Sequence, residues 1–250
     1  METLPLILAG FCLLSSTAVQ AEYREIHRTD CRRSFLSSLL QQEHIDAFFF
    51  RSATYCLCIL DEGDGHHFGS LRKALETAGC TAGVNGGYFA DDDASSPLGL
   101  VIHRGQCLNP LATRGFTVAG TLYDTGHGIY LERSSKLSHR LSQMQEAIQG
   151  GPFLIEQGRI IKGLNDTRRA PRTFVATDGR GQWCIAVTSS MTLHQLACWL
   201  EQGALSPFQV RTALNLDGGS SSAFYDKTSR VSIPSGKPVR NYVGIKPRHP

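Results

Sequence analysis

The stretch TALNLDGGSSSAFY at residues 212–225 decides the fold more than any other part of the chain. Residues 212–216 are short, apolar and β-type, and they predict a strand. Asp217 stands at the end of that strand, before Gly218 and Gly219, which let the backbone turn sharply. A carboxylate in this place can project into a cleft while backbone N–H groups point toward the same space. A plain turn or a helix cap fits the same residues, so the stretch alone leaves its role open.

Two glycine pairs interrupt the apolar pattern in a similar way. Residues 85–89 read NGGYF and follow the apolar run at 82–84. Two glycines at a strand end allow positive φ and a close approach of the backbone to a ligand. Asn-Gly is also a favoured hairpin turn, which leaves a purely structural interpretation open. The GGP sequence at 150–152 leads into the apolar residues 153–155 and predicts a strand entrance.

A basic segment precedes another expected strand. Residues 168–173 read RRAPRT and lead into the apolar residues 174–176. Three arginines at a strand entrance can form an anion site, because a guanidinium is planar, permanently charged and matched to phosphate. Pro171 stiffens the loop directly before Arg172. A solvated basic loop is the alternative that these residues leave open.

Start and stop signals predict three helices and a weaker fourth. The capping residues of the three are Thr29 or Asp30, Ser70 and Thr192. The helices are expected at residues 34–42, 71–77 and 193–202, with the weaker one at 138–148. Short apolar runs predict strands at residues 53–60, 98–103, 128–132, 153–156, 173–177, 183–188, 212–216 and 242–246. Strands outnumber helices and alternate with them irregularly. We therefore predict an α+β fold, a single domain on a mixed, mostly antiparallel β-sheet with a few flanking helices.

The N-terminal residues 1–21 are typical of a secretory signal peptide. Residues 4–17 are mostly apolar, small residues surround position 21, and the apolar stretch is short for a bilayer span. No Lys or Arg precedes it, and a membrane anchor is the alternative. We expect a secreted or periplasmic domain at residues 22–250, without a stable membrane span after signal cleavage. Its seven cysteines would allow up to three disulfide bonds, whose pairing the spacing does not reveal.

The bulk composition narrows the class of protein. Of the 250 residues, 41% are hydrophobic and 19% are charged, which is the balance of a folded globular protein. The net charge of +3 is scattered, so we expect no nucleic-acid partner. No GxSxG, P-loop or HExxH motif is present, which argues against an α/β-hydrolase, a P-loop NTPase and a zinc protease. The residues 66–67 and 91–93 fit exposed loops better than metal sites. We expect no cofactor and no metal at the site, and a structural divalent cation stays open.

Taken in order, these segments resemble the phosphodiester glycosidase family. The matching pieces are residues 85–89, 97–100 with Gly105, 150–152, 169–173, 215–222 and 238–244. Each piece is weak alone, but the ordered set is specific, and NLDGGS with PRT carries most of the weight. Residues 22–80 show no matching motif, and the short chain looks like a bacterial member. The resemblance implies hydrolysis of the bond between a sugar C1 and a phosphodiester oxygen.

The resemblance and the residues together imply a catalytic set of Asp217, Arg172 and Asn85. Glycosyl transfer passes through an oxocarbenium-like state that two carboxylates usually serve. A phosphate monoester leaves as a stable anion, so Arg172 can stabilise its charge in place of a second carboxylate. Asp217 is expected to stabilise positive charge or to act as nucleophile or base, and Asn85 to hydrogen-bond the sugar or the phosphate. The expected substrate-binding residues are Gly86, Gly87, Tyr88, Arg169, Thr173, Asn215, Gly218, Gly219 and Ser220.

Two other functions stay open on the sequence alone. A non-catalytic binder of envelope polysaccharide or sugar phosphate would keep the pocket without turnover. A metal-dependent phosphodiesterase would break the P–O bond, although the chain lacks a dense His and Asp cluster for a two-metal site. The favoured hypothesis is a secreted or periplasmic glycosidase whose partner is a carbohydrate phosphodiester, with N-acetylglucosamine-1-phosphodiesters as one candidate type.

Overall fold

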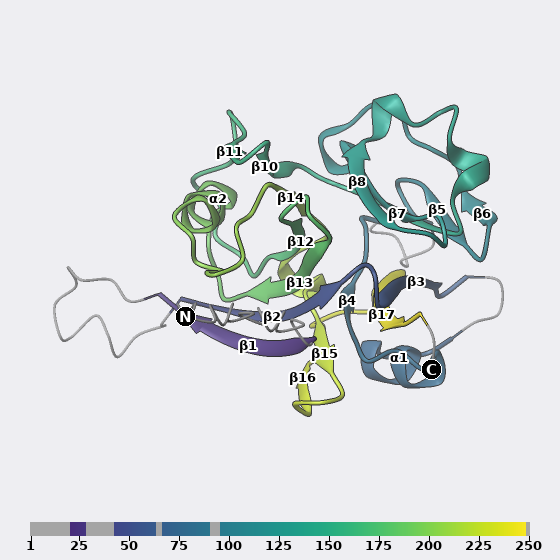
Figure 1. Cartoon of the computed structure of the whole chain (residues 1–250), viewed down its shortest axis with the longest axis horizontal. Coiled ribbons are helices and arrows are strands. Elements are labelled where there is room, and N and C mark those ends of the chain that lie inside the picture. Colours follow the sequence, from purple (N-terminus) through teal and green to yellow (C-terminus); the bar gives the residue numbers. More distant parts are fainter. Residues whose placement is uncertain (1–20, 29–42, 64–66, 91–95, 249–250) are drawn as a thin grey trace, which may run out of the picture.

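The computed structural model describes residues 21–28, 43–63, 67–90 and 96–248, and three sheets form the fold (Figure 1). Sheet 1 has the strand order β1 (Glu22–His27), β2 (His44–Arg51), β13 (Gln182–Thr188), β12 (Thr173–Thr177), β14 (Thr212–Asn215), β10 (Phe153–Glu156) and β11 (Arg159–Ile160). Sheet 2 has the order β16 (Val231–Ile233), β15 (Phe224–Asp226), β4 (Ala82–Asn85), β17 (Asn241–Pro247) and β3 (Tyr55–Asp61). Sheet 3 has the order β6 (Gln106–Asn109), β5 (Val101–His103), β9 (Glu146–Gly150), β7 (Gly120–Asp124) and β8 (Ile129–Arg133).

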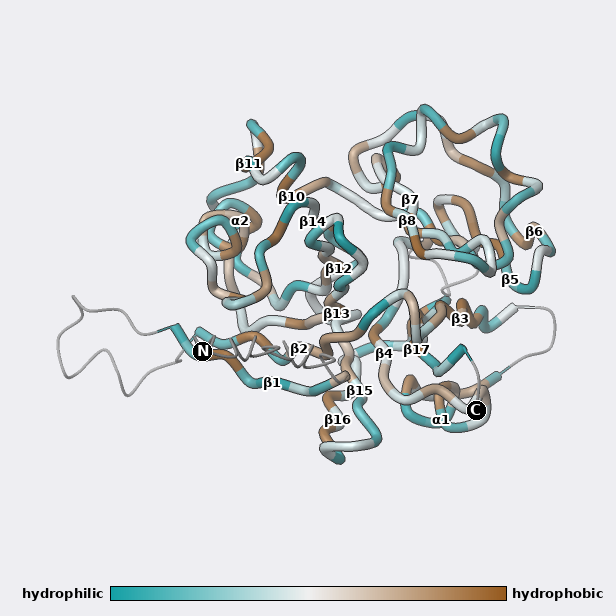
Figure 2. Tube along the Cα trace, viewed as in Figure 1, coloured by the Kyte–Doolittle hydropathy of each residue, from teal (hydrophilic) through white to brown (hydrophobic). Residues whose placement is uncertain are grey.

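One hydrophobic core lies where the three sheets face one another. Side chains along β2 alternate between the two faces of sheet 1. Phe48 and Phe50 enter the shared core, while Phe49 points to the opposite face. Strand β13 follows the same rule, since Ile185 pairs with Phe48 in register and belongs to the same core. Figure 2 shows that the hydrophobic stretches of the trace follow the strands and the two helices.

Each α-helix covers the outer face of one sheet. Helix α2 (Leu193–Glu201) packs on sheet 1, and Thr192 and Gln195 form the capping box at its start. Helix α1 (Leu71–Thr77) packs on sheet 2, and the Ser70 side chain accepts a hydrogen bond from the Lys73 N–H. Figure 1 shows the two helices on opposite sides of the molecule. In the described part of the chain, neither helix has the length and apolar character needed to cross a membrane.

These elements confirm the predicted α+β single-domain class, and every described strand pairing is antiparallel. The helix expected at residues 138–148 is wrong. A single 3-10 turn at Leu141–Gln143 and then β9 occupy that segment, because β9 lies between β5 and β7 and pairs with both. Pairing on two sides overrides the local helix propensity of the segment. The signal peptide at residues 1–21 falls almost wholly outside the described residues, and the helix expected at residues 34–42 does so entirely.

Two buried carboxylates join sheet 2 to sheet 3. Strand β3 lies at the edge of sheet 2, and its outward N–H groups need acceptors. Asp124 of β7 accepts from the Leu57 N–H at 3.2 Å, and Glu146 of β9 accepts from the Ile59 N–H at 2.8 Å. His103 contacts Glu146 at 3.1 Å, and this bond raises the pKa of the imidazole. The two carboxylates therefore cover the edge of β3 and fix the position of sheet 3.

Candidate active site

The segments singled out in the sequence meet where several strands end. Asn85 ends β4, Thr173 begins β12 and Asn215 ends β14. In sheet 1, Asn215 pairs with Phe174. In sheet 2, Asn85 pairs with Tyr242, next to the start of β17. Antiparallel pairing thus brings together strand ends that are distant in the sequence.

Asn85 is the hydrogen-bonding hub of these strand ends. Its side chain is 1% exposed. Its Nδ2 donates to the carbonyl oxygen of Asp217 at 2.7 Å. Its Oδ1 accepts from Thr173 Oγ1 at 2.7 Å and from the Ala223 N–H at 3.0 Å. The Thr173 hydroxyl also contacts Ser222 Oγ at 3.1 Å. One amide therefore fixes β4, β12 and the loop that carries Asp217 relative to one another.

The loop after Asp217 lies directly on the loop that leads to Arg172. The Gly219 N–H donates to the Pro171 carbonyl at 2.8 Å. A Cβ atom added at Gly218 would lie 3.0 Å from the same carbonyl and 3.8 Å from Arg172 Cα. Asp217 itself is partly exposed, and its Oδ1 accepts from the Gly218 N–H at 2.9 Å. The carboxylate and the guanidinium therefore belong to two loops in direct backbone contact.

Arg172 is a buried arginine whose guanidinium is only partly used. The residue is 9% exposed. Its Nε donates to the Met191 carbonyl at 3.0 Å, and its Nη2 donates to the Arg168 carbonyl at 2.5 Å. Burial lowers the pKa of Arg172, and the like charge of Arg168 adds to this effect. A guanidinium stays charged in proteins all the same. Among the described residues no partner is present for Nη1, which leaves one edge of the group available to an anion.

Tyr88 lies within electrostatic range of both charged residues. Asn215 Nδ2 donates to Tyr88 Oη at 2.8 Å and to the Gly151 carbonyl at 3.1 Å. Burial raises the pKa of Tyr88; the charge of Asp217 raises it further and that of Arg172 opposes this. The phenol is therefore neutral at physiological pH, and its hydroxyl hydrogen is available as a donor.

Asn241, at the start of β17, belongs to this site although the sequence did not single it out. Its carbonyl accepts from the Gly86 N–H and its Oδ1 accepts from the Gly87 N–H, both at 2.8 Å. A side chain at Gly86 would collide with Asn241 Oδ1, and one at Gly87 would collide with the Gln149 carbonyl. The NGG sequence is therefore glycine-rich because Asn241 and β9 approach it closely.

The backbone amides expected to line the pocket already have acceptors inside the chain. Those of Gly86 and Gly87 donate to Asn241, as described above. That of Gly218 donates to Asp217, and that of Gly219 to Pro171. Ser220 is exposed, and its carbonyl accepts from the Gly236 N–H at 2.7 Å. The roles of these residues toward a substrate stay predictions.

Three buried polar atoms near these strand ends have no partner in the part of the chain that the structure describes. They are Asn215 Oδ1, Ser221 Oγ and Asn241 Nδ2. Buried polar groups without a hydrogen bond are rare in folded proteins. All three belong to segments that form the site, so unused hydrogen-bonding capacity is concentrated there.

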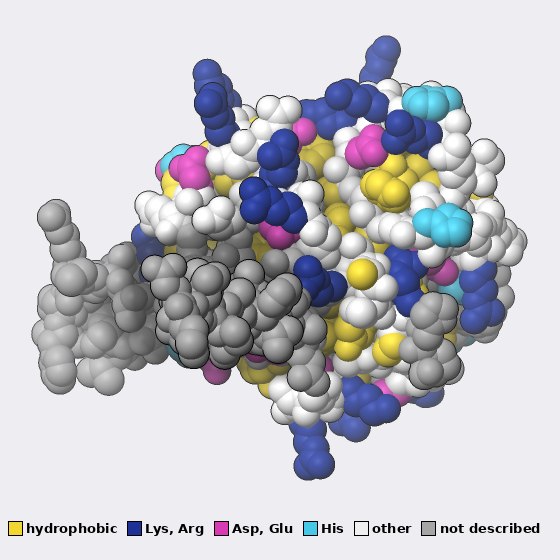
Figure 3. All heavy atoms as spheres, viewed as in Figure 1, with side chains coloured by type: hydrophobic (Ala, Val, Ile, Leu, Met, Phe, Trp, Pro, Cys, Tyr) yellow, Lys and Arg dark blue, Asp and Glu magenta, His cyan; other side chains and the backbone are white. Residues whose placement is uncertain are grey.

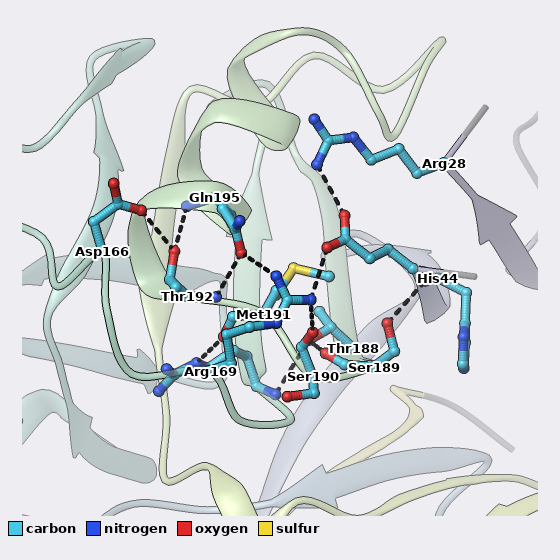
Figure 4. Close-up of polar contacts among 12 residues, drawn as sticks. Arg28, His44, Asp166, Arg169, Thr188, Ser189, Ser190, Met191, Thr192 and Gln195 are labelled. Carbon is cyan, nitrogen blue, oxygen red and sulfur yellow. Dashed lines mark hydrogen bonds and ion pairs between the residues drawn. The ribbon is translucent and has the colours of Figure 1, made fainter. Parts of the chain in front are cut away.

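Arg169, one of the expected substrate-binding residues, is already bonded inside the chain, as Figure 4 shows for its contact with Gln195. Its Nη2 donates to Glu43 Oε1 at 2.8 Å and to the Ser190 carbonyl at 2.5 Å, and its Nη1 donates to Gln195 Oε1 at 2.9 Å. Arg28 binds the other oxygen of Glu43 at 2.8 Å. Burial raises the pKa of Glu43, but the bonds from the two arginines outweigh it and lower the pKa below its usual value. The expected phosphate contact of Arg169 stays a prediction.

Charged residues elsewhere do not form a comparable cluster on the face seen in Figure 3. Lys and Arg side chains are scattered over that face, with Asp and Glu between them. Within the described residues, no group of three or more His, Cys, Asp and Glu side chains could hold a metal ion. Asp217, Arg172 and Tyr88 are titratable groups at the strand ends, and the charge of Arg168 acts on both Arg172 and Tyr88.

A family model described as phosphodiester glycosidase matches residues 78–246. The chain belongs to the phosphodiester glycosidase family. This match confirms the resemblance read from the motifs. The matched range contains every residue of the expected site, from Asn85 to Ser220.

Solved structures share the fold of this chain. The catalytic domain of zebrafish N-acetylglucosamine-1-phosphodiester alpha-N-acetylglucosaminidase, auto-inhibited by its pro-peptide, aligns with a TM-score of 0.66 and 17% identity over 92% of this chain and 84% of that chain. A hypothetical protein from Synechocystis aligns with a TM-score of 0.54 and 15% identity over 90% of this chain and 61% of that chain.

A curated relative carries a different activity in its name. The 4-hydroxyproline 2-epimerase of Chromohalobacter salexigens is 25% identical over 187 residues. The match covers 69% of this chain and 60% of the epimerase. The chain therefore spans less than two thirds of that relative.

Replacing Thr173 by Val removes the hydroxyl that bonds Asn85 and keeps the side-chain shape. We expect the free energy of unfolding to fall by about 1–2 kcal/mol, because Asn85 Oδ1 loses a buried donor. Thr177→Val is the matched control at the far end of β12, where the hydroxyl donates to the Gln182 carbonyl at 2.9 Å. Urea denaturation should show similar losses of unfolding free energy for both variants. Only Thr173→Val should lower kcat for the hydrolysis proposed below. Equal kcat values for the two variants would contradict a role for the Asn85 hub in the site.

Replacing Glu43 by Gln tests the ion pairs that hold Arg169. A depressed folded-state pKa means that the carboxylate stabilises the fold above its unfolded pKa and loses this effect as the pH falls through the folded pKa. At pH 7 we expect Glu43→Gln to lower the free energy of unfolding by about 1–3 kcal/mol. The difference from the parent should shrink as the pH falls below about 4.

The matched control for this change is Glu156→Gln, whose carboxylate pairs with the exposed Arg133. A surface pair contributes little, so this variant should unfold almost as the parent does at both pH values. Urea denaturation at pH 7 and pH 3.5 measures all three proteins. If Glu43→Gln lowers the free energy of unfolding by the same amount at both pH values, the ion pairs are not the cause of the loss.

Proposed function

We propose that this phosphodiester glycosidase hydrolyses sugar-1-phosphodiesters by breaking the bond between C1 and the phosphate oxygen. The observation that carries the proposal is the pairing of two loops by the bond from the Gly219 N–H to the Pro171 carbonyl. One loop presents the carboxylate of Asp217, and the other presents the unused edge of Arg172. A carboxylate beside a guanidinium suits a reaction in which positive charge develops on the sugar and negative charge on the leaving phosphate.

Arg172 would bind the leaving phosphate. Its Nη1 has no partner among the described residues, and its other nitrogens are anchored by the Met191 and Arg168 carbonyls. An anchored guanidinium loses little freedom when it binds an oxyanion, which favours the transition state. The neutral hydroxyl of Tyr88 lies within range of the same charges and would donate a further hydrogen bond.

Asp217 would act on the sugar side of the scissile bond. As a carboxylate it either stabilises the oxocarbenium-like state, attacks C1, or deprotonates the attacking water. Because the departing phosphate monoester is a stable anion, no acid is needed to protonate it. This explains how one carboxylate and one arginine can do the work that most glycosidases divide between two carboxylates.

The substrate type and the compartment are part of the proposal. The name of the zebrafish protein with the same fold supports N-acetylglucosamine-1-phosphodiesters as the first compounds to test. The apolar residues 4–17 support secretion or a periplasmic location, where the chain would meet carbohydrate phosphodiesters outside the cytoplasm.

Hydrolysis in ¹⁸O-labelled water tests the bond that breaks. The purified chain is incubated with an N-acetylglucosamine-α-1-phosphodiester, and the products are analysed by mass spectrometry. We expect ¹⁸O in the released sugar and none in the phosphate, because water attacks C1 either of the substrate or of a glycosyl-enzyme intermediate. Incorporation into the phosphate would mean P–O cleavage, and sensitivity to a chelator would then support a metal-dependent phosphodiesterase. Binding without turnover would support a carbohydrate-binding protein, and epimerisation of 4-hydroxyproline in a parallel assay would support the activity named in the curated relative.

Asp217→Asn tests the carboxylate with little effect on the fold. The asparagine Oδ1 still accepts from the Gly218 N–H, so the loop keeps its hydrogen bond. We expect kcat/KM to fall by about 10²–10⁴-fold, because the charge that serves the sugar is removed. Asp178→Asn is the matched control, since its Oδ1 accepts from the Arg180 N–H at 2.7 Å and the Gln182 N–H at 3.0 Å, just beyond the far end of β12. Full activity of a folded Asp217→Asn protein would refute the assignment.

A further inference from the structure

Two buried cysteines lie in one hydrophobic cluster beneath helix α1. Cys58 lies in the middle of β3, and Cys80 lies two residues before β4. Each is 2% exposed, and both belong to the cluster that packs α1 on sheet 2. Neither residue is used by the proposed mechanism.

Gly244 of β17 explains how the two sulfur atoms meet. Gly244 pairs with Cys58 in the register of β3 and β17. A Cβ atom added at Gly244 would lie 2.6 Å from Cys80 Sγ and 3.2 Å from the Cys58 carbonyl. The Cys80 thiol therefore occupies the space above Gly244, directly beside Cys58. A side chain at position 244 would displace it.

The register of β3 and β17 and the position of Cys80 Sγ over Gly244 place the two thiols side by side. The neighbouring Cys80 thiol lowers the pKa of Cys58, and burial opposes that effect. The other described cysteines have different surroundings. Cys107 is exposed, Cys184 is fully buried among apolar side chains, and the Cys56 and Cys198 sulfur atoms contact a backbone carbonyl and His194 respectively. Within the described residues, Cys58 and Cys80 are the two cysteines that share one buried cluster, and no disulfide is present there.

We propose that Cys58 and Cys80 form a disulfide bond when the chain folds in the presence of a small-molecule disulfide such as oxidised glutathione. The thiolate of one cysteine attacks the glutathione disulfide, forms a mixed disulfide and releases one glutathione thiolate. The thiolate of the second cysteine then attacks the protein sulfur of that mixed disulfide and releases the second glutathione. Two protein thiols lose two electrons and two protons in total, and one glutathione disulfide gains them. Because both sulfur atoms are buried in the folded chain, the exchange takes place before α1 docks.

The bond would connect β3 to the entrance of β4 and close a loop that contains α1. Cys80 lies five residues before Asn85, so the bond would anchor the strand that presents the Asn85 hub. Such a bond stabilises a fold mainly by restricting the unfolded chain. The inference requires only the contact between the thiols, so it stands or fails separately from the proposed substrate.

Peptide mapping of the full chain tests the inference. The protein is refolded with reduced and oxidised glutathione, unfolded in N-ethylmaleimide to block free thiols, and digested with trypsin without reductant. Cleavage after Arg51, Arg72, Lys73 and Arg104 separates the two cysteines into residues 52–72 and 74–104. We expect a disulfide-linked pair of these peptides. Modification of both cysteines by N-ethylmaleimide, or a link from Cys80 to another cysteine, would overturn the proposal.

Variants identify the cysteine in the first peptide, which also contains Cys56. The link should persist in Cys56→Ser and disappear in Cys58→Ser. A second measurement compares the melting temperature of chains refolded with oxidised glutathione or with dithiothreitol. The oxidised parent should melt about 5–10 °C higher than the reduced one, and the Cys58→Ala, Cys80→Ala double variant should show no difference. An equal gap in the double variant would assign the effect to other cysteines.

Discussion

The arrangement of the site depends on the buried amide of Asn85. A buried amide that loses its partners destabilises a protein by about 1–3 kcal/mol for each group left unpaired, so its bonds constrain their neighbours strongly. Asn85 bonds to Thr173 of β12, to the backbone at Ala223 and to the carbonyl of Asp217. These three contacts come from segments more than 80 residues away in the sequence. Sheets 1 and 2 therefore meet in one orientation at this point, and the loop with Asp217 follows from it.

The same constraint explains why a buried arginine is tolerated next to the hub. Removing a guanidinium from water is costly unless its donors find acceptors. The carbonyls of Met191 and Arg168 supply two of them, and both belong to loops that β12 and α2 hold in place. The remaining edge of the Arg172 guanidinium, at Nη1, can still donate hydrogen bonds to an anion. Burial and the like charge of Arg168 disfavour the charged form of Arg172, so an oxyanion that binds there would relieve part of this cost.

Motifs with their own backbone requirement could be predicted from the sequence, and partners set by sheet register could not. The caps at Ser70 and Thr192 are local, and both helices begin as predicted. The glycines beside Asn85 indicate that another part of the chain approaches closely. The residue that approaches is Asn241, more than 150 positions later in the sequence. Only the pairing of β17 with β4 places it there. Arg169 was expected among the substrate-binding residues from its charge and from its place in the motif at residues 169–173. Its carboxylate partner, Glu43, precedes it by 126 residues and carries no motif.

The internal bonds of the glycine amides limit how this site can stabilise negative charge. A backbone oxyanion hole needs N–H groups that point to the ligand and have no other acceptor. The amides of Gly86 and Gly87 are used by Asn241, and those of Gly218 and Gly219 by Asp217 and Pro171. The glycines thus allow the loops to approach each other, and their own roles toward a substrate stay predictions. In the proposed reaction the charge on a leaving phosphate would then be met by side chains, among them the guanidinium of Arg172 and the hydroxyl of Tyr88. Such a site would discriminate by the charge of the leaving group, which is the property that separates a sugar phosphodiester from an ordinary glycoside.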